Sequence, residues 1–228
     1  MARMRIAKQK YRNWLATPQW RAHLESIAAD GTESIGPLLS FLLLDPLTRH
    51  RAAVALGASA ARLARTAPEA ARNILRRLMW HMNEESGNIG WGIPEAFAEI
   101  LAASESLARD FHRVLCSYIM DLDRDDNYCD HAILRRSCYW AVGRLAQERP
   151  ALCLHARPWL VRGLEDTDEI CRGMAAWALG QLPPDIMDAP ALRRLAAAED
   201  TPECEIFDGE HLLRISCARL AEQALQRH

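Results

Sequence analysis

The feature that most constrains this chain is a helical pattern that recurs about every 40 residues. Five segments place small or apolar residues three, four, six and seven positions after their first residue, as a helix with one apolar face does. They begin 42, 44, 37 and 42 residues apart and cover residues 49–57, 91–99, 135–143, 172–180 and 214–222. A second helical pattern precedes each segment, in residues 37–44, 71–81, 109–120, 158–164 and 191–198. One helix pair cannot bury its apolar side alone, so the pattern predicts stacked pairs in an α-solenoid.

The fourth segment carries a resemblance to a known family. Its sequence, Arg-Gly-Met-Ala-Ala-Trp-Ala-Leu-Gly, follows a turn with Asp166 and Asp168 and resembles the HEAT-like repeat of phycobilin-lyase-related proteins. The resemblance covers residues 35–228 and implies an all-α, right-handed, armadillo-like solenoid of about five helix pairs. Because alternation with period two is absent, we expect no strands.

The residues before the repeats are expected to cap the array. Residues 1–34 read as one or two helices, and Tyr11, Trp14 and Trp20 are candidates to cover the exposed end of the stack. We therefore expect one continuous domain, with capping helices in 1–34 and the repeat array in 35–228.

Composition excludes several classes of protein. The longest apolar run, residues 37–44, is far shorter than the ~20 residues needed to span a bilayer. Five Lys and Arg in the first twelve residues interrupt any signal-peptide core. The seven cysteines are unclustered and odd in number, which favours reduced thiols used as small buried side chains. We expect a cytoplasmic protein that does not enter membranes.

Charge is divided unevenly along the chain. Residues 1–80 hold 13 Lys and Arg against 5 Asp and Glu, whereas residues 81–228 hold 15 against 25. Such a division can steer a partner or orient self-association, or it can simply mark solvated surfaces. The basic first third could contact phosphates, but the acidic repeat body disfavours nucleic acid as a partner.

An arginine opens most of the second helices, as at positions 49, 135 and 172. An arginine at an interface is usually found with an anionic partner. We expect it to pair with an acidic residue of an adjacent turn and so to link neighbouring units.

The second unit departs most from the repeat, because Trp91 stands where the arginine is expected. Gly87, Gly90 and Gly92 give its turn backbone freedom, and Pro94 and Glu95 suit the first turn of a helix. Two interpretations remain open. The turn is a ligand, metal or partner loop, or it is a long polar turn in which Trp91 packs as a plug.

Several carboxylates accompany this turn. Glu95 and Glu99 are four residues apart and share one helix face, and Glu84 and Glu85 lie shortly before them. Together with His81 they could hold a divalent cation, although their spacing matches no specific metal motif. The loop, with its resemblance to a bacterial HEAT-repeat group of unassigned role, is the first candidate site.

Two other turns are also long and acidic, in residues 121–131 and 203–211. Asp130 is the expected N-cap of the helix that follows the first of them, and Tyr128 and His131 are candidate partner contacts. The turns of a solenoid lie along one edge, so these residues predict a negative ridge that is either solvated or docks a basic partner.

Aromatic residues recur on the second helices. Tyr139, Trp140 and Trp177 either line a concave binding surface or belong to the core.

The sequence favours a non-enzymatic protein-interaction or scaffold module that uses its concave face and its extended acidic turns. We expect no catalytic residue, cofactor or dedicated metal ligand, and the partner protein and oligomeric state stay open. The alternative is a cofactor-handling factor or lyase-like enzyme, for a tetrapyrrole or a metal, with a carboxylate-rich site in the second repeat. The candidate contact residues are Asn83, Glu84, Glu85, Trp91, Glu95, Glu99, Tyr128, His131, Trp140 and Trp177.

Overall fold

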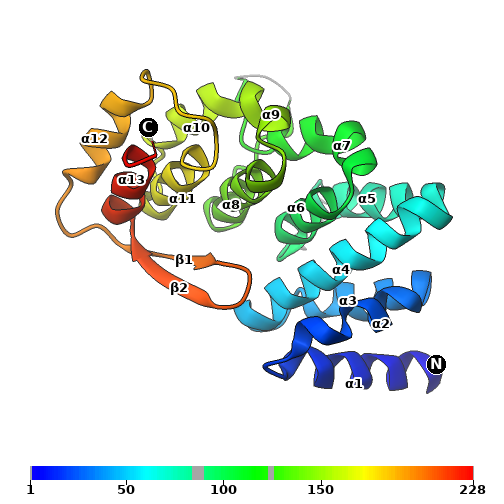
Figure 1. Cartoon of the computed structure of the whole chain (residues 1–228). Coiled ribbons are helices and arrows are strands. Elements are labelled where there is room, and N and C mark those ends of the chain that lie inside the picture. The colour runs from blue at the N-terminus through cyan, green and yellow to red at the C-terminus, as the bar shows by residue number, and fades with distance from the viewer. Residues whose placement is uncertain (1, 84–89, 123–125, 228) are drawn as a thin grey trace. The chain divides into compact units, whose positions relative to one another are not determined.

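The computed structural model describes residues 2–83, 90–122 and 126–227, and the chain divides into two compact units, Met1–Phe111 and His112–His228. The helices of the first unit are α1 (Ala2–Ala16), η1 (Trp20–His23), α2 (Leu24–Ala29), η2 (Gly31–Ser34), α3 (Ile35–Phe41), α4 (Pro46–Thr66), α5 (Pro68–Met82) and α6 (Ile93–Ala103), and α7 (Glu105–Ser117) runs into the second unit (Figure 1). Helices α3, α5 and α7 are the first helices of three successive pairs, as the repeat pattern predicts.

Close packing of second helices builds the core of the first unit. Helix α4 packs against α3, α5 and α6. A Cβ atom added to Gly57 of α4 would lie 2.7 Å from the main-chain oxygen of Glu99 on α6, so the two backbones touch there. Alanine and glycine at these positions permit an approach that larger side chains would block.

The N-terminal helices cover the side of α3 and α4. Helix α1 packs against both, and α2 packs against α4. Tyr11 and Trp20 are fully buried, and the ring of Trp14 stacks on that of His23 at 4.7 Å. Arg51 of α4 donates a hydrogen bond to the main-chain oxygen of Leu15, 2.7 Å away, which fixes the end of α1.

The second unit repeats the same construction. Its elements are α8 (Ala132–Glu148), α9 (Pro150–Cys153), η3 (Leu154–Ala156), α10 (Arg157–Gly163), α11 (Glu169–Leu179), α12 (Ala189–Ala196), β1 (Glu203–Phe207), β2 (Leu212–Ser216) and α13 (Cys217–Leu225). The second helices α8, α11 and α13 lie side by side, because α11 packs against both of the others (Figure 1). The described chain is therefore a mostly helical repeat structure, as expected.

The structure contains a β-hairpin, although the sequence predicts an all-α fold. Strands β1 and β2 are antiparallel, with Cys204 opposite Ile215 and Ile206 opposite Leu213. The helix expected over 214–222 begins only at Cys217, and the expectation of no strands was wrong. In β1 the burial alternates through Glu203, Cys204 and Glu205, and Gly209 turns the chain at a φ of +108°.

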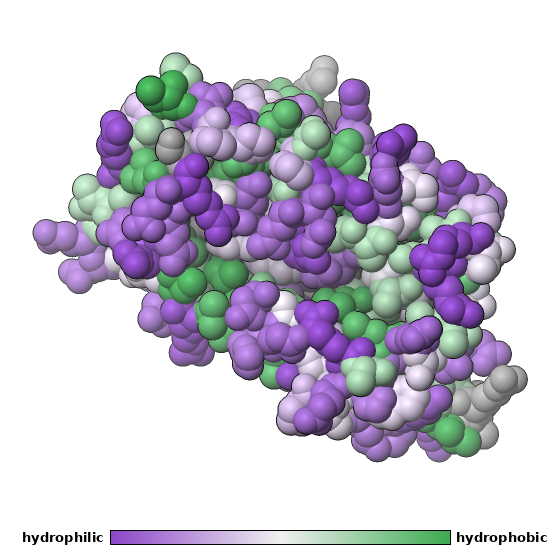
Figure 2. Space-filling model, viewed as in Figure 1, coloured by the Kyte–Doolittle hydropathy of each residue, from purple (hydrophilic) through white to green (hydrophobic). Residues whose placement is uncertain are grey.

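Hydrophobic side chains are mostly inside. Hydrophilic residues cover most of the face seen in Figure 2, and hydrophobic ones appear in small areas between them. Within the described residues, no helix combines the length and apolar character needed to cross a membrane.

Candidate functional site

Helices α4, α8 and α11 all begin with a side-chain N-cap. In each, a side chain just before the helix accepts a hydrogen bond from the main-chain N–H three residues later, which satisfies one of the free donors of the first turn. The capping residues are Asp45 (3.0 Å from the Thr48 nitrogen), His131 (3.3 Å from the Leu134 nitrogen) and Asp168 (2.9 Å from the Cys171 nitrogen).

The repeat arginine follows four residues after each cap and closes the turn in front of its own helix. Its guanidinium donates to main-chain oxygens of that turn. The contacts are Arg49 Nε to Leu42 (3.0 Å), Arg135 Nη1 to Cys129 and Asp130 (both 2.9 Å) and Arg172 Nε to Asp166 (2.5 Å).

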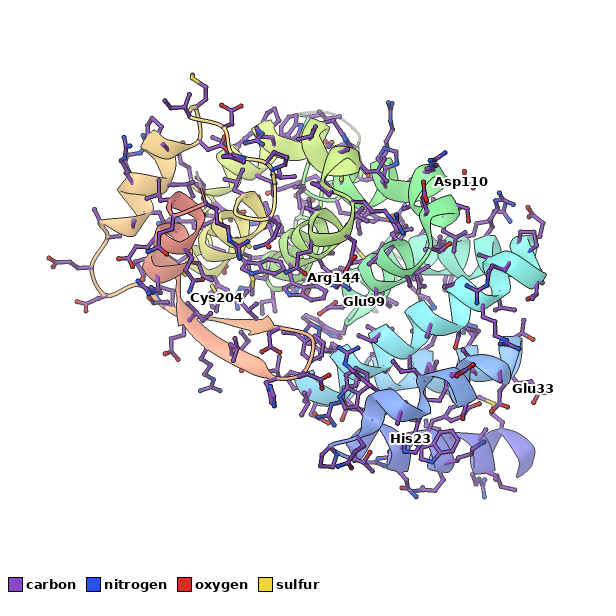
Figure 3. All side chains as sticks on the ribbon, in the orientation of Figure 1. His23, Glu33, Glu99, Asp110, Arg144 and Cys204 are labelled. Carbon is purple, nitrogen blue, oxygen red and sulfur yellow. The ribbon has the colours of Figure 1, made fainter. Side chains whose placement is uncertain are left out.

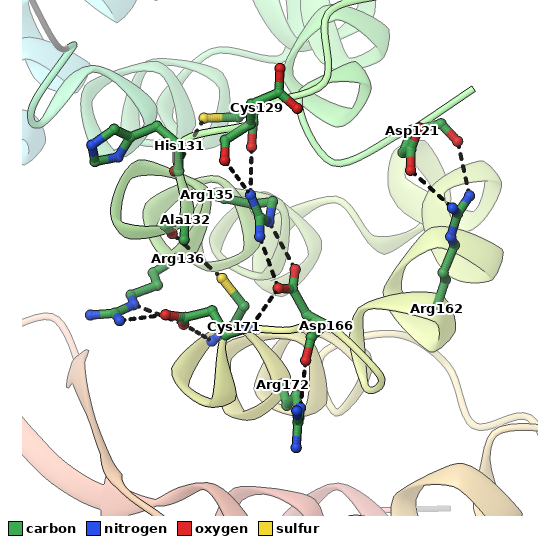
Figure 4. Close-up of polar contacts among 12 residues, drawn as sticks. Asp121, Cys129, His131, Ala132, Arg135, Arg136, Arg162, Asp166, Cys171 and Arg172 are labelled. Carbon is green, nitrogen blue, oxygen red and sulfur yellow. Dashed lines mark hydrogen bonds and ion pairs between the residues drawn. The ribbon is translucent and has the colours of Figure 1, made fainter. Parts of the chain in front are cut away.

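Arg135 has a second role, which links two repeats. Its Nε and Nη2 atoms each donate to a carboxylate oxygen of Asp166 at 2.8 Å, and both side chains are almost completely buried (Figure 4). Burial alone raises the pKa of the Asp166 carboxyl, but hydrogen bonds from Arg135 and the Asp168 amide outweigh it and lower that pKa. The expected pairing of the repeat arginine with the turn of an adjacent unit is confirmed at this position.

The next residue repeats the link. Arg136 Nε lies 2.9 Å from Asp168 Oδ1, and its Nη2 donates to the other carboxylate oxygen. Hydrogen bonding to Arg136 lowers the pKa of Asp168 to about 2, although partial burial opposes the shift. One carboxylate therefore caps α11 and binds α8.

A cavity of about 280 Å³ adjoins the buried Arg135–Asp166 pair. Across it, Arg162 of α10 donates to the carboxylate of Asp121 at 2.9 Å and to its main-chain oxygen at 3.1 Å (Figure 4). The cavity is lined by Ile119, Asp121, Tyr128, Arg135, Tyr139, Trp159, Arg162, Glu165, Asp166 and Thr167.

Aromatic rings accompany the charges of this cavity. The guanidinium of Arg135 lies 5.2 Å from the centre of the Tyr128 ring, and that of Arg162 lies 5.7 Å from the Trp159 ring. Burial raises the pKa of both Tyr128 and Tyr139, so both hydroxyls stay neutral at ordinary pH. The walls therefore offer charged groups, neutral hydroxyls and ring faces together.

The predicted loop of the second repeat lies in the first unit. Glu84, Glu85 and Gly87 are outside the described residues, and Asn83 is exposed just after α5. Glu95 and Glu99 are 3% and 5% exposed on α6, so they do not form an open acidic face. Pro94 and Glu95 stand in the first turn of the helix, as predicted.

Trp91 does not occupy the arginine position of the repeat. It precedes α6 and is half-buried, and it lines a cavity of about 90 Å³ with Leu42, Leu43 and His81. The N-cap of helix α6 is Gly92, so the position four residues after the cap is Ala96. The alignment of Trp91 with the repeat arginines was wrong by five residues, because it followed apolar spacing rather than the helix start.

The remaining candidates lie in the second unit. Tyr128 lines the larger cavity, while His131 is exposed and caps α8, so the expected N-cap Asp130 was wrong by one residue. Trp140 and Trp177 stack with their ring centres 6.1 Å apart and are 2% and 9% exposed. These two rings join α8 to α11 within the core.

Sequence reasoning missed five residues of the cavity wall, namely Ile119, Trp159, Arg162, Glu165 and Thr167. Trp159 and Arg162 are three residues apart near the end of a first helix, which places them on one face next to the turn. That spacing is the signal in the sequence that indicates a shared surface for the two side chains. Among the described residues, no three His, Cys, Asp or Glu side chains come together as a metal site.

Comparison with known proteins agrees with this architecture. Residues 132–182, from α8 through α11, match the HEAT-like repeat family. The chain is 29% identical over 184 residues to an uncharacterized protein of Archaeoglobus fulgidus, which covers 80% of this chain and 91% of the archaeal protein. The chain thus contains a HEAT-like repeat and resembles an archaeal protein along most of its length.

Solved structures extend the likeness to the whole fold. The crystal structure of an engineered protein from a structural genomics consortium matches 96% of this chain and 97% of its own, with a TM-score of 0.51 and 16% identity. A designed armadillo repeat protein for modular peptide recognition matches 96% and 98%, with a TM-score of 0.49 and 18% identity. The chain is a mostly helical repeat protein that contains a HEAT-like repeat.

Proposed function

We propose that this protein is a non-enzymatic protein-binding scaffold. A basic segment of its partner docks in the unit His112–His228, at the turns that precede α8 and α11. The observation that carries the proposal is the cavity beside Arg135 and Asp166, where the turns of two consecutive repeats meet. Repeat proteins commonly bind extended partners along a surface shared by several repeats.

The charges favour a basic side chain of the partner. Arg135 is occupied by Asp166 and by main-chain oxygens, and Arg162 is occupied by Asp121. Glu165 is 71% exposed, and its partner Arg194 is also exposed, so this carboxylate can exchange partners at little cost. A Lys or Arg side chain would meet Glu165 and the faces of Tyr128 and Trp159.

The size of the cavity supports a side chain rather than a large cofactor. Pockets for small molecules usually measure roughly 300–1,000 Å³, and this one, at about 280 Å³, lies below that range. One partner side chain would fill it, while the neighbouring turns contact the rest of the segment.

A peptide array with graded Lys, Arg, Asp and Glu content tests this function. We expect the labelled protein to bind basic peptides and not acidic ones. Glu165→Lys should weaken the binding at least tenfold, because it turns an attraction into a repulsion, and Trp159→Ala should also weaken it.

Glu205→Lys is the matched control. Glu205 of β1 is also exposed and paired with an exposed arginine, Arg214, but it is not part of the cavity wall. Equal losses in the two charge variants would mean that only overall charge matters, and that result, or equal binding of acidic peptides, would overturn the proposal.

A further inference from the structure

Two thiols meet where the β-hairpin joins the last helix. Cys204 lies on β1, next to α11 and α13 (Figure 3), and Cys217 is the first residue of α13. Their Sγ atoms are 3.5 Å apart, and the two side chains are 0% and 1% exposed. This is a buried dithiol on adjacent elements rather than a single structural cysteine.

Both backbones at the pair are held in place. The Cys217 N–H donates to the main-chain oxygen of Pro202 at 3.0 Å, and Cys204 lies opposite Ile215 in the hairpin ladder. The thiols also lie near main-chain oxygens of α11, with Cys217 Sγ 3.2 Å from Glu169 and Cys204 Sγ 3.7 Å from Ile170. The pairing of the sulfurs therefore follows from the fold.

A glycine of α11 leaves room for the two sulfurs. A Cβ atom added to Gly173 would lie 2.5 Å from Cys204 Sγ and 2.6 Å from Cys217 Sγ. Any larger residue at this position would push the thiols away, so Gly173 is what permits them to lie together.

We propose that Cys204 and Cys217 are an oxidation site, at which a small hydroperoxide converts the two thiols into a disulfide. A disulfide needs the sulfurs about 2.05 Å apart, so they must approach by about 1.5 Å. Rotation of the two side chains supplies this movement while the hairpin ladder stays intact. A hydroperoxide suits the buried position because it is small and uncharged.

The reaction balances with a hydroperoxide as the two-electron oxidant. Cys217 sulfur attacks one peroxide oxygen, an S–O bond forms as the O–O bond breaks, and the thiol proton leaves with the alcohol. Cys204 sulfur then attacks the sulfenic sulfur, an S–S bond forms as the S–O bond breaks, and the Cys204 proton leaves with hydroxide as water. Both cysteines are oxidised, and the peroxide is reduced to one alcohol and one water.

Cys217 suits the attacking position. The hydrogen bond from Cys204 lowers the pKa of the Cys217 thiol, although burial opposes this effect. Its place in the first turn of α13 also favours a thiolate, because the helix N-terminus carries partial positive charge. Cys204 is thereby left as the resolving thiol.

The disulfide would tie β1 to the start of α13 across a short loop. Such closure restricts the unfolded chain and stabilises the folded one, provided that the native geometry accepts the bond. We expect oxidised protein to melt about 5 °C higher than reduced protein.

The test treats the folded, reduced protein with hydrogen peroxide and follows intact mass, thiol alkylation and peptide mapping. We expect a loss of about 2 Da, a Cys204–Cys217 cross-linked peptide and full reversal by dithiothreitol. Cys204→Ser should instead yield a sulfenic acid at Cys217 that dimedone traps, and Gly173→Ala should slow the formation of the disulfide at least tenfold.

The other close thiols of this unit provide the internal comparison. Cys116 and Cys153 are hydrogen-bonded, and so are Cys129 and Cys138. A disulfide that maps to either of those pairs would overturn the proposal. So would a Cys204–Cys217 bond that forms only in denaturant, or one that lowers the melting temperature.

Discussion

Helices α8 and α6 hold equivalent places in their repeats, yet their starts are built differently. In front of α8, the His131 side chain caps the helix and Arg135 binds two main-chain oxygens of the turn. In front of α6, Gly92 has no side chain to cap with, and its backbone takes a φ of +75°. The amide of Ile93 bonds to the main-chain oxygen of Gly90 instead.

This difference shows that the repeat arginine has two separate structural roles. Closing the turn in front of its own helix is common to Arg49, Arg135 and Arg172, whereas the ion pair of Arg135 to the following repeat depends on Asp166. Where the arginine is replaced by Ala96, a glycine with positive φ shapes the turn. The turn in front of a second helix can therefore be shaped either by an arginine side chain or by the backbone of a glycine with positive φ.

The largest expected effect comes from Arg135→Met. This variant leaves the Asp166 carboxylate buried without its cation, and such a change costs about 3–5 kcal/mol. Arg172→Met is the control, since it removes a hydrogen bond to a main-chain oxygen and should cost about 1–2 kcal/mol. Urea unfolding followed by circular dichroism measures both. Equal losses would show that the link between repeats adds nothing to turn closure.

The second prediction concerns Gly92→Ala. A Cβ atom here would lie 2.8 Å from Leu42 Cβ, and positive φ adds strain, so we expect a loss of about 2–4 kcal/mol. Gly31→Ala separates the two costs, because Gly31 has a φ of +57° but nothing within 4 Å of the added atom. It should lose about 1–2 kcal/mol. If both variants lose the same amount, contact with Leu42 does not constrain the turn.

Local patterns made most of the fold predictable from sequence. The apolar spacing located five helix pairs, and the repeat arginine predicted a link that Arg135 makes. The helix starts were less predictable, since Asp130 and His131 are both plausible caps and backbone conformation decides between them. The hairpin was missed because its strands have only five residues each and the alternation in β1 is brief.

The candidate site was predictable only in part, for a related reason. Its carboxylates and aromatics are visible in the sequence, but burial decides which of them reach a cavity. Glu95 and Glu99 are buried on α6, whereas Glu165 and Trp159 line the wall on turns and helix ends. Spacing along one helix cannot predict which neighbouring helix covers it.

The third prediction is a pH dependence located at Asp168. Its pKa is about 2 in the folded protein and 3.8 without the fold, so between these two pH values the folded state binds fewer protons than the unfolded one. The stability it contributes is present above about pH 4 and disappears as the pH falls towards about 2. Arg136→Gln should therefore cost on the order of 1–2 kcal/mol at pH 6 and almost nothing near pH 2. A cost that is the same at both pH values would mean that Arg136 acts by packing.

The smallest effect is expected from the α8 cap, and it returns to the contrast between helix starts. Helices α4 and α11 begin with aspartates, whereas α8 begins with His131, whose hydrogen bond to the Leu134 amide is 3.3 Å long. Aspartate is a strong N-cap, and its negative charge suits the helix dipole, so His131→Asp should stabilise the protein by about 0.5 kcal/mol. His131→Ala should destabilise it by a similar amount, because the amide loses its acceptor. Chemical denaturation of both variants and of the parent protein measures these differences in stability. If the Asp variant is no more stable than the Ala variant, the cap of α8 adds little to the hydrogen bonds by which Arg135 already holds the turn.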